Sequence, residues 1–164
     1  MNARSQGGFT YLGLLFAVAL LGIALSAVGI VWSAQIRREK ESELLFVGAQ
    51  IRTAIGRYYS ETPSGAHGYP ASLQDLLQDP RWPQVHRHLR RLYFDPMTGT
   101  QDWQLILAPE GGIMGVATSS MAMPMKRTNF LQADAAFDDA ECVCDWQFVY
   151  RPFVRGQPLQ KPLR

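Results

Sequence analysis

Residues 9–32 read FTYLGLLFAVALLGIALSAVGIVW and contain no charged side chain. At about 1.5 Å per residue, a helix of these 24 residues is roughly 36 Å long, whereas the hydrocarbon core of a bilayer is about 30 Å thick. Buried helices of globular domains are usually shorter than this run. We therefore expect a membrane-spanning helix at residues 9–33, preceded by a short polar leader at residues 1–8.

A cleaved secretory signal is the main alternative for this run. Trp32-Ser33-Ala34 ends in small residues, as a signal cleavage site does. The apolar region of a signal peptide is only about 7–15 residues long, so we favour a retained helix. The flanking charges leave the orientation open, since the leader carries Arg4 and the far flank, 37–43, holds three basic and three acidic residues.

The residues from Ile36 to Tyr59 continue the helix with an amphipathic pattern. Apolar side chains recur at spacings of three and four, which places them on one face: Leu44, Val47, Ile51, Ala54, Ile55 and Tyr58. Polar and charged side chains fall on the other faces: Arg38, Glu41, Gln50, Arg52 and Arg57. The two runs together predict one proline-free helix of about 50 residues, whose second half, 34–60, packs on a small domain. Gly22 and Gly29 lie two turns apart, which favours a close-packing face for other helices.

The remaining residues predict a domain at 61–155, rich in turns, and a flexible tail at 156–164. The expected elements are a short helix capped by Ser72 and Asp75, a helical turn through Val85, Leu89 and Leu92, and strands at 103–107, 113–117 and 146–150. Asp95-Pro96 predicts a turn in which the carboxylate bonds the backbone two residues on. The fold class is therefore α+β, a long N-terminal helix packed on a small antiparallel sheet.

Composition excludes several classes of function. The net charge is +2 and the basic residues are spread out, which argues against a general nucleic-acid binder. One basic cluster stands out, namely His86, Arg87, His88, Arg90 and Arg91, and we interpret it as a solvated helix face rather than a DNA-binding patch. No Ser-His-Asp, metal-ligand or phosphate-loop pattern appears, so we do not expect an enzyme.

The segment Arg4-Ser5-Gln6-Gly7-Gly8-Phe9-Thr10-Tyr11-Leu12 resembles the prepilin processing site of type IV pilins and type II secretion pseudopilins. The resemblance implies cleavage between Gly8 and Phe9 by a prepilin peptidase, N-methylation of Phe9 and a pilin-like fold. It also implies a single-pass protein of the bacterial inner membrane, with the leader in the cytoplasm and the C-terminal domain in the periplasm.

Further segments extend the resemblance, and one position departs from it. Tyr69 to Leu77, and Asp95 to Gly99 leading into Trp103, are similar to segments of the major pseudopilin group. The family's pattern calls for a glutamate four residues after the methylated phenylalanine, where this chain has Gly13. We therefore favour a minor or atypical subunit over a main fibre subunit that assembles by packing alone.

Two clusters near the C-terminus are candidates for chemistry. Five acidic residues form a candidate calcium loop, in a place comparable to the calcium site of major pseudopilins, although a solvated loop is the interpretation we favour: Asp134, Asp138, Asp139, Glu141 and Asp145. Cys142 and Cys144 are separated by one residue, and in an oxidising periplasm they are a candidate disulfide.

We expect a structural pseudopilin-like subunit of a type II secretion system. Its implied partners are other pseudopilins, the inner-membrane secretion platform and the prepilin peptidase. A minor type IV pilin that binds DNA or surfaces through 86–91 is the rival hypothesis. A third is a membrane-anchored periplasmic thiol enzyme that uses Cys142 and Cys144.

Overall fold

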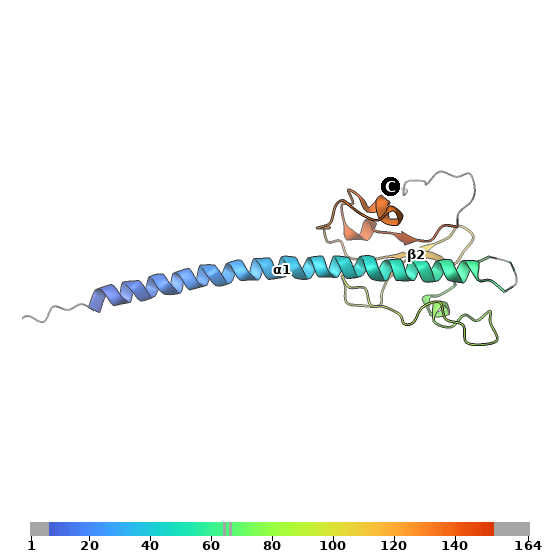
Figure 1. Ribbon diagram of the computed structural model, residues 1–164, viewed down its shortest axis with the longest axis horizontal. Helices are drawn as coiled ribbons and strands as arrows, with labels where there is room; N and C mark the ends of the chain where they lie inside the picture. The colour runs from blue at the N-terminus through green and yellow to red at the C-terminus, as the bar shows by residue number, and fades with distance from the viewer. Residues whose placement is uncertain (1–6, 64, 66, 153–164) are drawn as a thin grey trace, which may run out of the picture. The chain divides into compact units, whose positions relative to one another are not determined.

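The computed structural model describes residues 7–63, 65 and 67–152, and within these it leaves the side chains of residues 7–10 and 24–31 undescribed. The chain divides into two compact units, residues 1–39 and 40–164. One helix, α1 (Gly7–Ser60), has 54 residues and enters both units (Figure 1). The prediction of a single long helix is thus confirmed. Most of the expected leader and the whole expected tail lie outside the described residues.

The first unit consists of the N-terminal part of α1. Its described large apolar side chains are exposed, from Tyr11 at 66% to Ile23 at 68% and Trp32 at 67%. Among the described residues, no helical stretch combines the length and the mean hydropathy of a membrane crossing.

The second unit is built on the C-terminal part of α1. The six apolar residues that the sequence placed on one face are 0–5% exposed, which confirms that face as the core side of the helix: Leu44, Val47, Ile51, Ala54, Ile55 and Tyr58. They pack in one cluster with Ile113, Val116, Trp146 and Phe148. Most of the stability of this half of α1 therefore comes from burying an apolar face against the domain.

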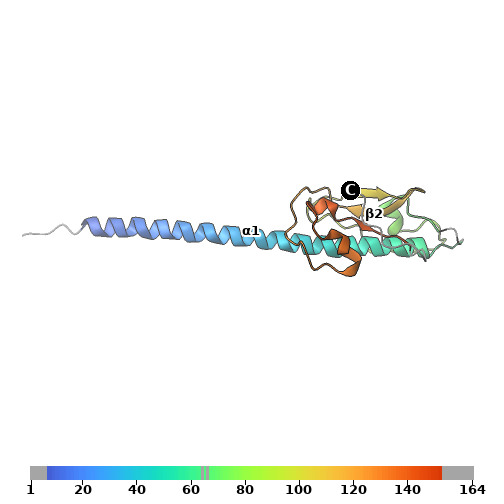
Figure 2. The same ribbon diagram turned by 90° about the horizontal axis from the view of Figure 1, so that it is seen from above.

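Three short antiparallel strands form the sheet, β1 (Gln104–Leu107), β2 (Ile113–Ala117) and β3 (Phe148–Val149), in the order β1-β2-β3. The sheet lies along the C-terminal part of α1 (Figure 2). The prediction of a small antiparallel sheet is confirmed, although β3 is shorter than expected. Trp103, the residue before β1, is buried, whereas Leu105 and Leu107 within β1 are exposed. A register shift in the pairing of β1 with β2 lies between Ile106 and Leu107.

Two glycines of α1 let aromatic rings approach the helix closely. A Cβ atom on Gly48 would collide with the ring of Phe148, and a Cβ atom on Gly56 would lie 2.7 Å from the ring of Tyr150. The aromatic side chains of β3 and the residue after it thus pack directly on the helix backbone.

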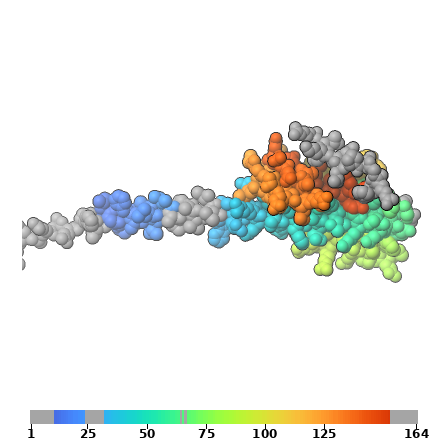
Figure 3. Space-filling model, turned by 45° about the horizontal axis from the view of Figure 1, so that its top comes forward, coloured from blue at the N-terminus to red at the C-terminus, as the bar shows by residue number. Residues whose placement is uncertain are grey.

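The loops on either side of α1 contain three one- or two-turn 3₁₀ helices. The first, η1 (Leu73–Leu76), is capped as predicted, since the Asp75 carboxylate accepts hydrogen bonds from the Ser72 N–H at 3.0 Å and the Ser72 hydroxyl at 2.9 Å. The others, η2 (Gln132–Phe137) and η3 (Val143–Asp145), lie across α1 from the segment around η1 (Figure 3).

The predicted helical turn through Val85, Leu89 and Leu92 is wrong. Residues 85–92 are irregular, and their backbone bonds to the region of η1 instead of to itself. His88 and Leu89 donate their N–H groups to the Leu76 carbonyl at 2.9 and 2.8 Å. Leu89 is buried by this docking, whereas Val85 is 65% exposed.

The turn at Asp95 is as predicted. The Asp95 carboxylate accepts the Met97 N–H at 2.9 Å, and its other oxygen accepts the hydroxyl of Thr118 at the end of β2. Asp95 and Thr118 are both fully buried, so this hydrogen bond ties the turn to the sheet at a place where an unpaired carboxylate would be costly.

Candidate functional site

The N-terminal part of α1 presents apolar side chains in every direction. Nine large apolar side chains between residues 11 and 23 are 48–68% exposed: Tyr11, Leu12, Leu14, Leu15, Phe16, Val18, Leu20, Leu21 and Ile23. These positions follow one another over more than three helical turns, so no face of this segment is polar. Exposed apolar surface of this extent marks an interaction surface.

The glycines and the processing junction that the sequence singled out also lie in α1. Added Cβ atoms at Gly13 and Gly22 would meet no neighbouring atom within 4 Å, so both positions can admit another helix closely. Gly8, Phe9 and Gly29 belong to the helix by their backbone, but their side-chain surroundings lie outside the described residues.

Glu41 corrects the sequence analysis, which placed it away from the packed face. Its side chain is buried, and its two carboxylate oxygens accept the N–H groups of Met125 and Lys126 at 2.8 and 3.0 Å. The partners lie more than 80 residues away in the sequence, so the helical pattern could not reveal them. Glu41 thereby fastens the long 118–131 loop to the start of the packed half of α1.

The acidic residues of the candidate calcium loop are largely engaged elsewhere. Asp134 is buried and forms an ion pair with Arg52 at 2.6 Å. The Asp145 carboxylate accepts the N–H groups of Glu141 and Cys142 at 3.2 Å and so caps η3. Asp138, Asp139 and Glu141 are exposed, and within the described part of the chain the five carboxylates do not converge into one ion-sized group.

Cys142 and Cys144 are joined in a disulfide with their Cα atoms 5.1 Å apart. Cys142 is the residue before η3 and Cys144 lies within it, so the pair sits in a tight turn rather than on a strand. The bridge fixes this turn beside the buried Trp146 and Val143.

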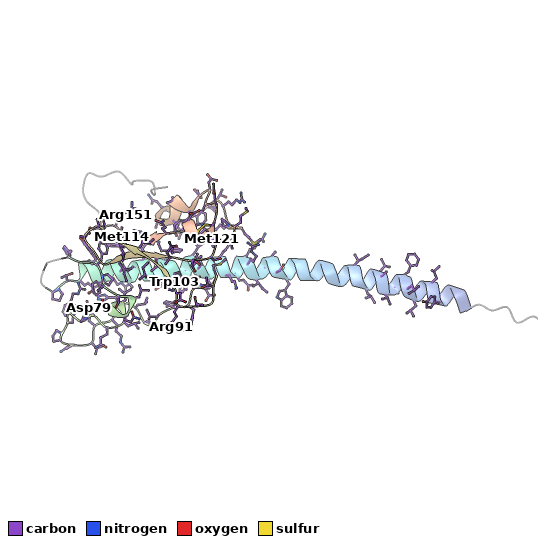
Figure 4. The ribbon with its side chains drawn as sticks, turned by 180° about the vertical axis from the view of Figure 1, so that it is seen from behind. Asp79, Arg91, Trp103, Met114, Met121 and Arg151 are labelled. Atoms are coloured by element: carbon purple, nitrogen blue, oxygen red, sulfur yellow. A yellow bond between two sulfur atoms is a disulfide. The ribbon has the colours of Figure 1, made fainter. Side chains whose placement is uncertain are left out.

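A buried polar cluster beside the C-terminal end of α1 was not found from the sequence. Asp79 is 1% exposed and accepts hydrogen bonds from Arg81 Nε at 2.8 Å and Nη2 at 2.6 Å. Arg81 also donates to the Tyr58 carbonyl at 2.7 Å, and its guanidinium lies 3.5 Å from the centre of the Tyr58 ring. Figure 4 shows Asp79 next to this end of the helix.

The electrostatics of Asp79 follow from these contacts. Burial opposes ionisation, but the hydrogen bonds from Arg81 and His88 outweigh it and hold the pKa of Asp79 well below its usual range. The hydrogen bond to Asp79 likewise raises the pKa of Arg81. The pair is therefore ionised under ordinary conditions.

Three side chains converge at the solvent edge of this cluster. His86 Nε2 lies 3.0 Å and His88 Nδ1 lies 3.7 Å from the same oxygen, Oε2 of Glu61. His88 Nε2 lies 3.0 Å from the Asp79 carboxylate. Glu61 follows the last residue of α1, whereas the histidines belong to the 85–92 segment, so the fold alone brings these groups together.

The predicted basic cluster therefore splits into two parts. His88 is buried and half-buried His86 faces Glu61, while Arg87, Arg90 and Arg91 are exposed. The interpretation as one solvated helix face is wrong, because the segment is not helical and His88 is buried.

The domain also contains an open groove of about 440 Å³. Its walls come from α1, η1, the 89–103 segment and the first two strands, and include Ile51, Leu73, Leu89, Trp103 and Leu105. The partly exposed Leu105 forms one rim of this groove.

No protein-family model, curated protein or solved structure matches this chain. The residues and the geometry described above thus carry the functional argument. Two regions differ most in character, the apolar N-terminal part of α1 and the α+β domain that folds around its C-terminal part.

Proposed function

We propose that this chain is a pseudopilin-like structural subunit of a type II secretion system. In this proposal residues 9–32 anchor it in the bacterial inner membrane, and the α+β domain lies in the periplasm. The N-terminal part of α1 then packs with the helices of other pseudopilins to form the core of a fibre, on the secretion platform of the inner membrane. Its work is mechanical rather than catalytic.

The observation that carries the proposal is the apolar surface of residues 11–23. A helix on the surface of a soluble domain has one apolar face, whereas a helix that is apolar all round needs lipid or other helices on every side. Covering nine large apolar side chains completely is worth at most about 14–27 kcal/mol, at about 1.5–3 kcal/mol each. Lipid before assembly and neighbouring subunits after assembly both supply such cover.

The processing junction adds support from the sequence. Gly8-Phe9 stands directly before the charge-free run, as in prepilins, and glycine allows the chain to approach a protease closely. At Gly13 no carboxylate is available to pair with the terminal amine of a neighbouring subunit. The proposal therefore includes a minor or atypical place in the fibre, such as its tip.

N-terminal processing tests this proposal directly. The full chain is co-expressed with a prepilin peptidase, purified from membranes, and its intact mass and terminal peptide are measured. We expect a mature chain that begins at N-methylated Phe9, and a Gly8→Leu variant that keeps the full leader. A chain that still begins at Met1, or that begins after Ala34, would contradict the proposal.

A minor type IV pilin is a second candidate, favoured by the exposure of Arg87, Arg90 and Arg91. Three exposed cations on one short segment can contact phosphates. A gel-shift assay with the full chain distinguishes the two functions. Binding that is lost in the triple alanine variant favours the pilus role, and absence of binding favours the secretion role.

A further inference from the structure

We propose that Glu61, His86 and His88 form a zinc site at the C-terminal end of α1, with a water molecule as the fourth ligand. The inference concerns the domain alone and does not depend on the secretion or pilus role. It rests on the convergence of three ligand atoms, on one buried ring nitrogen that makes no hydrogen bond, and on the carboxylate that accepts a hydrogen bond from the same ring.

The three ligand atoms are close enough to share one ion. Glu61 Oε2, His86 Nε2 and a ring nitrogen of His88 all lie within 4.8 Å of one another. Two of the separations are 3.0 and 3.7 Å. Ligands at about 2.0–2.2 Å from a tetrahedral zinc ion are spaced by about this much, so only small side-chain movements are needed.

The buried nitrogen is His88 Nδ1. The side chain of His88 is 1% exposed, and its Nδ1 atom makes no hydrogen bond, although the ring faces Glu61. When Nε2 carries the proton and donates it to Asp79, Nδ1 holds a lone pair that points toward a carboxylate. Two electron-pair donors that face each other repel unless a cation lies between them, and a metal ion can fill this place as a proton on Nδ1 would.

The groups behind His88 are those of a metal-binding histidine. Such a ligand usually donates its second ring N–H to a carboxylate, which fixes the tautomer and the orientation of the ring. Here Asp79 accepts that hydrogen bond at 3.0 Å, and Arg81 holds Asp79 in place with two further bonds. This arrangement orients Nδ1 before any ion binds.

The ligand set selects the class of metal. Two imidazole nitrogens and one carboxylate oxygen suit zinc, which accepts three protein ligands and a water molecule. Calcium and magnesium prefer six or more oxygen ligands, which the three side chains do not provide. His86 and Glu61 are 38% and 47% exposed, so the ion and its water ligand have access from solvent.

Zinc at this position would cross-link two segments that are far apart in the sequence. Glu61 stands immediately after α1, and the histidines stand in the segment that docks on η1. An ion that binds only the folded chain shifts the unfolding equilibrium toward the folded state. The site would thus fasten the end of the long helix to the domain.

Metal binding by the full chain, purified in detergent and stripped with a chelator, tests the inference. Isothermal titration with Zn²⁺ should give one site per chain and a raised thermal midpoint, whereas Ca²⁺ and Mg²⁺ should give neither. His86→Ala and Glu61→Gln should each weaken Zn²⁺ binding at least tenfold. Both side chains are partly exposed, so these variants should still fold.

Two matched controls lie outside the site. His67→Ala removes an exposed histidine that stacks on Tyr59, and Glu110→Gln removes an exposed carboxylate; neither should change the affinity for Zn²⁺. Asp79→Asn should weaken binding by about 10–100-fold through the orientation of His88. Absence of stoichiometric Zn²⁺ binding would overturn the proposal, as would equal affinity in the wild type, His86→Ala and Glu61→Gln.

Discussion

Both halves of α1 carry large apolar side chains, but the surroundings of these side chains are opposite. In the first half, Leu20 is 65% exposed and Gly22 has open space where a Cβ atom would be. In the second half, Leu44 is 0% exposed and the ring of Phe148 occupies that space at Gly48. Hydrophobic sequence therefore does not by itself say which partner it packs against. The second half packs against the domain of its own chain, and in our proposal the first half packs against lipid and other subunits.

The largest contrast is expected for leucine truncations in the two halves. Leu44→Ala should lower the free energy of unfolding of the domain by about 2–5 kcal/mol, because it leaves a cavity in a close-packed core. Leu20→Ala should leave that free energy unchanged and instead weaken co-assembly with partner pseudopilins. Chemical denaturation of the full chain, followed by tryptophan fluorescence, to which the buried Trp103 and Trp146 contribute, measures the first effect, and crosslinking in membranes measures the second. Equal destabilisation by Leu44→Ala and Leu20→Ala would refute the assignment of only the second half of α1 to the core of the domain.

Glu41 sharpens the boundary between the halves. Glu41→Gln should cost about 1–3 kcal/mol, because one of two backbone N–H groups loses a buried charged acceptor. The exposed Glu43 provides the matched control, and Glu43→Gln should change the unfolding free energy by less than about 0.5 kcal/mol. If the two variants unfold at the same denaturant concentration, the fastening role of Glu41 is wrong.

Glycine-to-alanine substitutions should lower the free energy of unfolding in the second half of α1 but not in the first half. Gly48→Ala should destabilise the domain by about 1–3 kcal/mol, since the added methyl group displaces the ring of Phe148. Gly22→Ala should be neutral or stabilising by at most about 1 kcal/mol, because alanine favours the helix. A bulkier Gly22→Leu change should leave folding intact and impair co-assembly. Normal crosslinking of Gly22→Leu to partner subunits would count against a packing role for this glycine.

Acid should unfold the second half through Asp79. Its pKa in the folded state lies below the unfolded value of about 3.9, so its contribution to stability is complete above about pH 4 and is lost as the pH falls below that. The unfolding free energy of the wild type should therefore fall more steeply below pH 4 than that of Asp79→Asn. The unfolding free energies of the two proteins are measured by chemical denaturation between pH 2 and pH 6. The same pH dependence in both proteins would show that Asp79 is not responsible for the loss of stability in acid.

The long helix and the core were predictable because their signals are local. Apolar residues at spacings of three and four identified every buried apolar position from Leu44 to Tyr58, and the capping pair Ser72 and Asp75 identified η1. The alternation in the strands identified the sheet. Each of these patterns follows from the geometry of one element and needs no knowledge of its partner.

The errors concern residues whose surroundings are set by distant segments. Glu41 is buried because its carboxylate accepts two N–H groups of loop 118–131, and Leu105 and Leu107 are exposed on the edge strand β1. The apolar residues Val85, Leu89 and Leu92 have helical spacing. Their segment is nevertheless irregular, because His88 and Leu89 donate their N–H groups to the Leu76 carbonyl. The sequence did not reveal the cluster of Glu61 with His86 and His88, because Glu61 comes from a distant segment. The two histidines, separated by one residue, are the local signal that could have indicated a shared metal ion.

The most direct test of the different surroundings proposed for the two halves of α1 compares two exposed positions of this helix in native membranes. Leu20 and Phe46 are 65% and 59% exposed in the chain, so single cysteines at these sites have similar access to solvent unless a bilayer or a fibre covers one of them. The native cysteines are joined in a disulfide and do not compete for a maleimide. We predict rapid labelling of Phe46→Cys by a membrane-impermeant maleimide, and labelling of Leu20→Cys only after unfolding in detergent. Equal labelling of both sites, before detergent is added and with the reagent present on both sides of the membrane, would contradict the proposed membrane or fibre environment of Leu20.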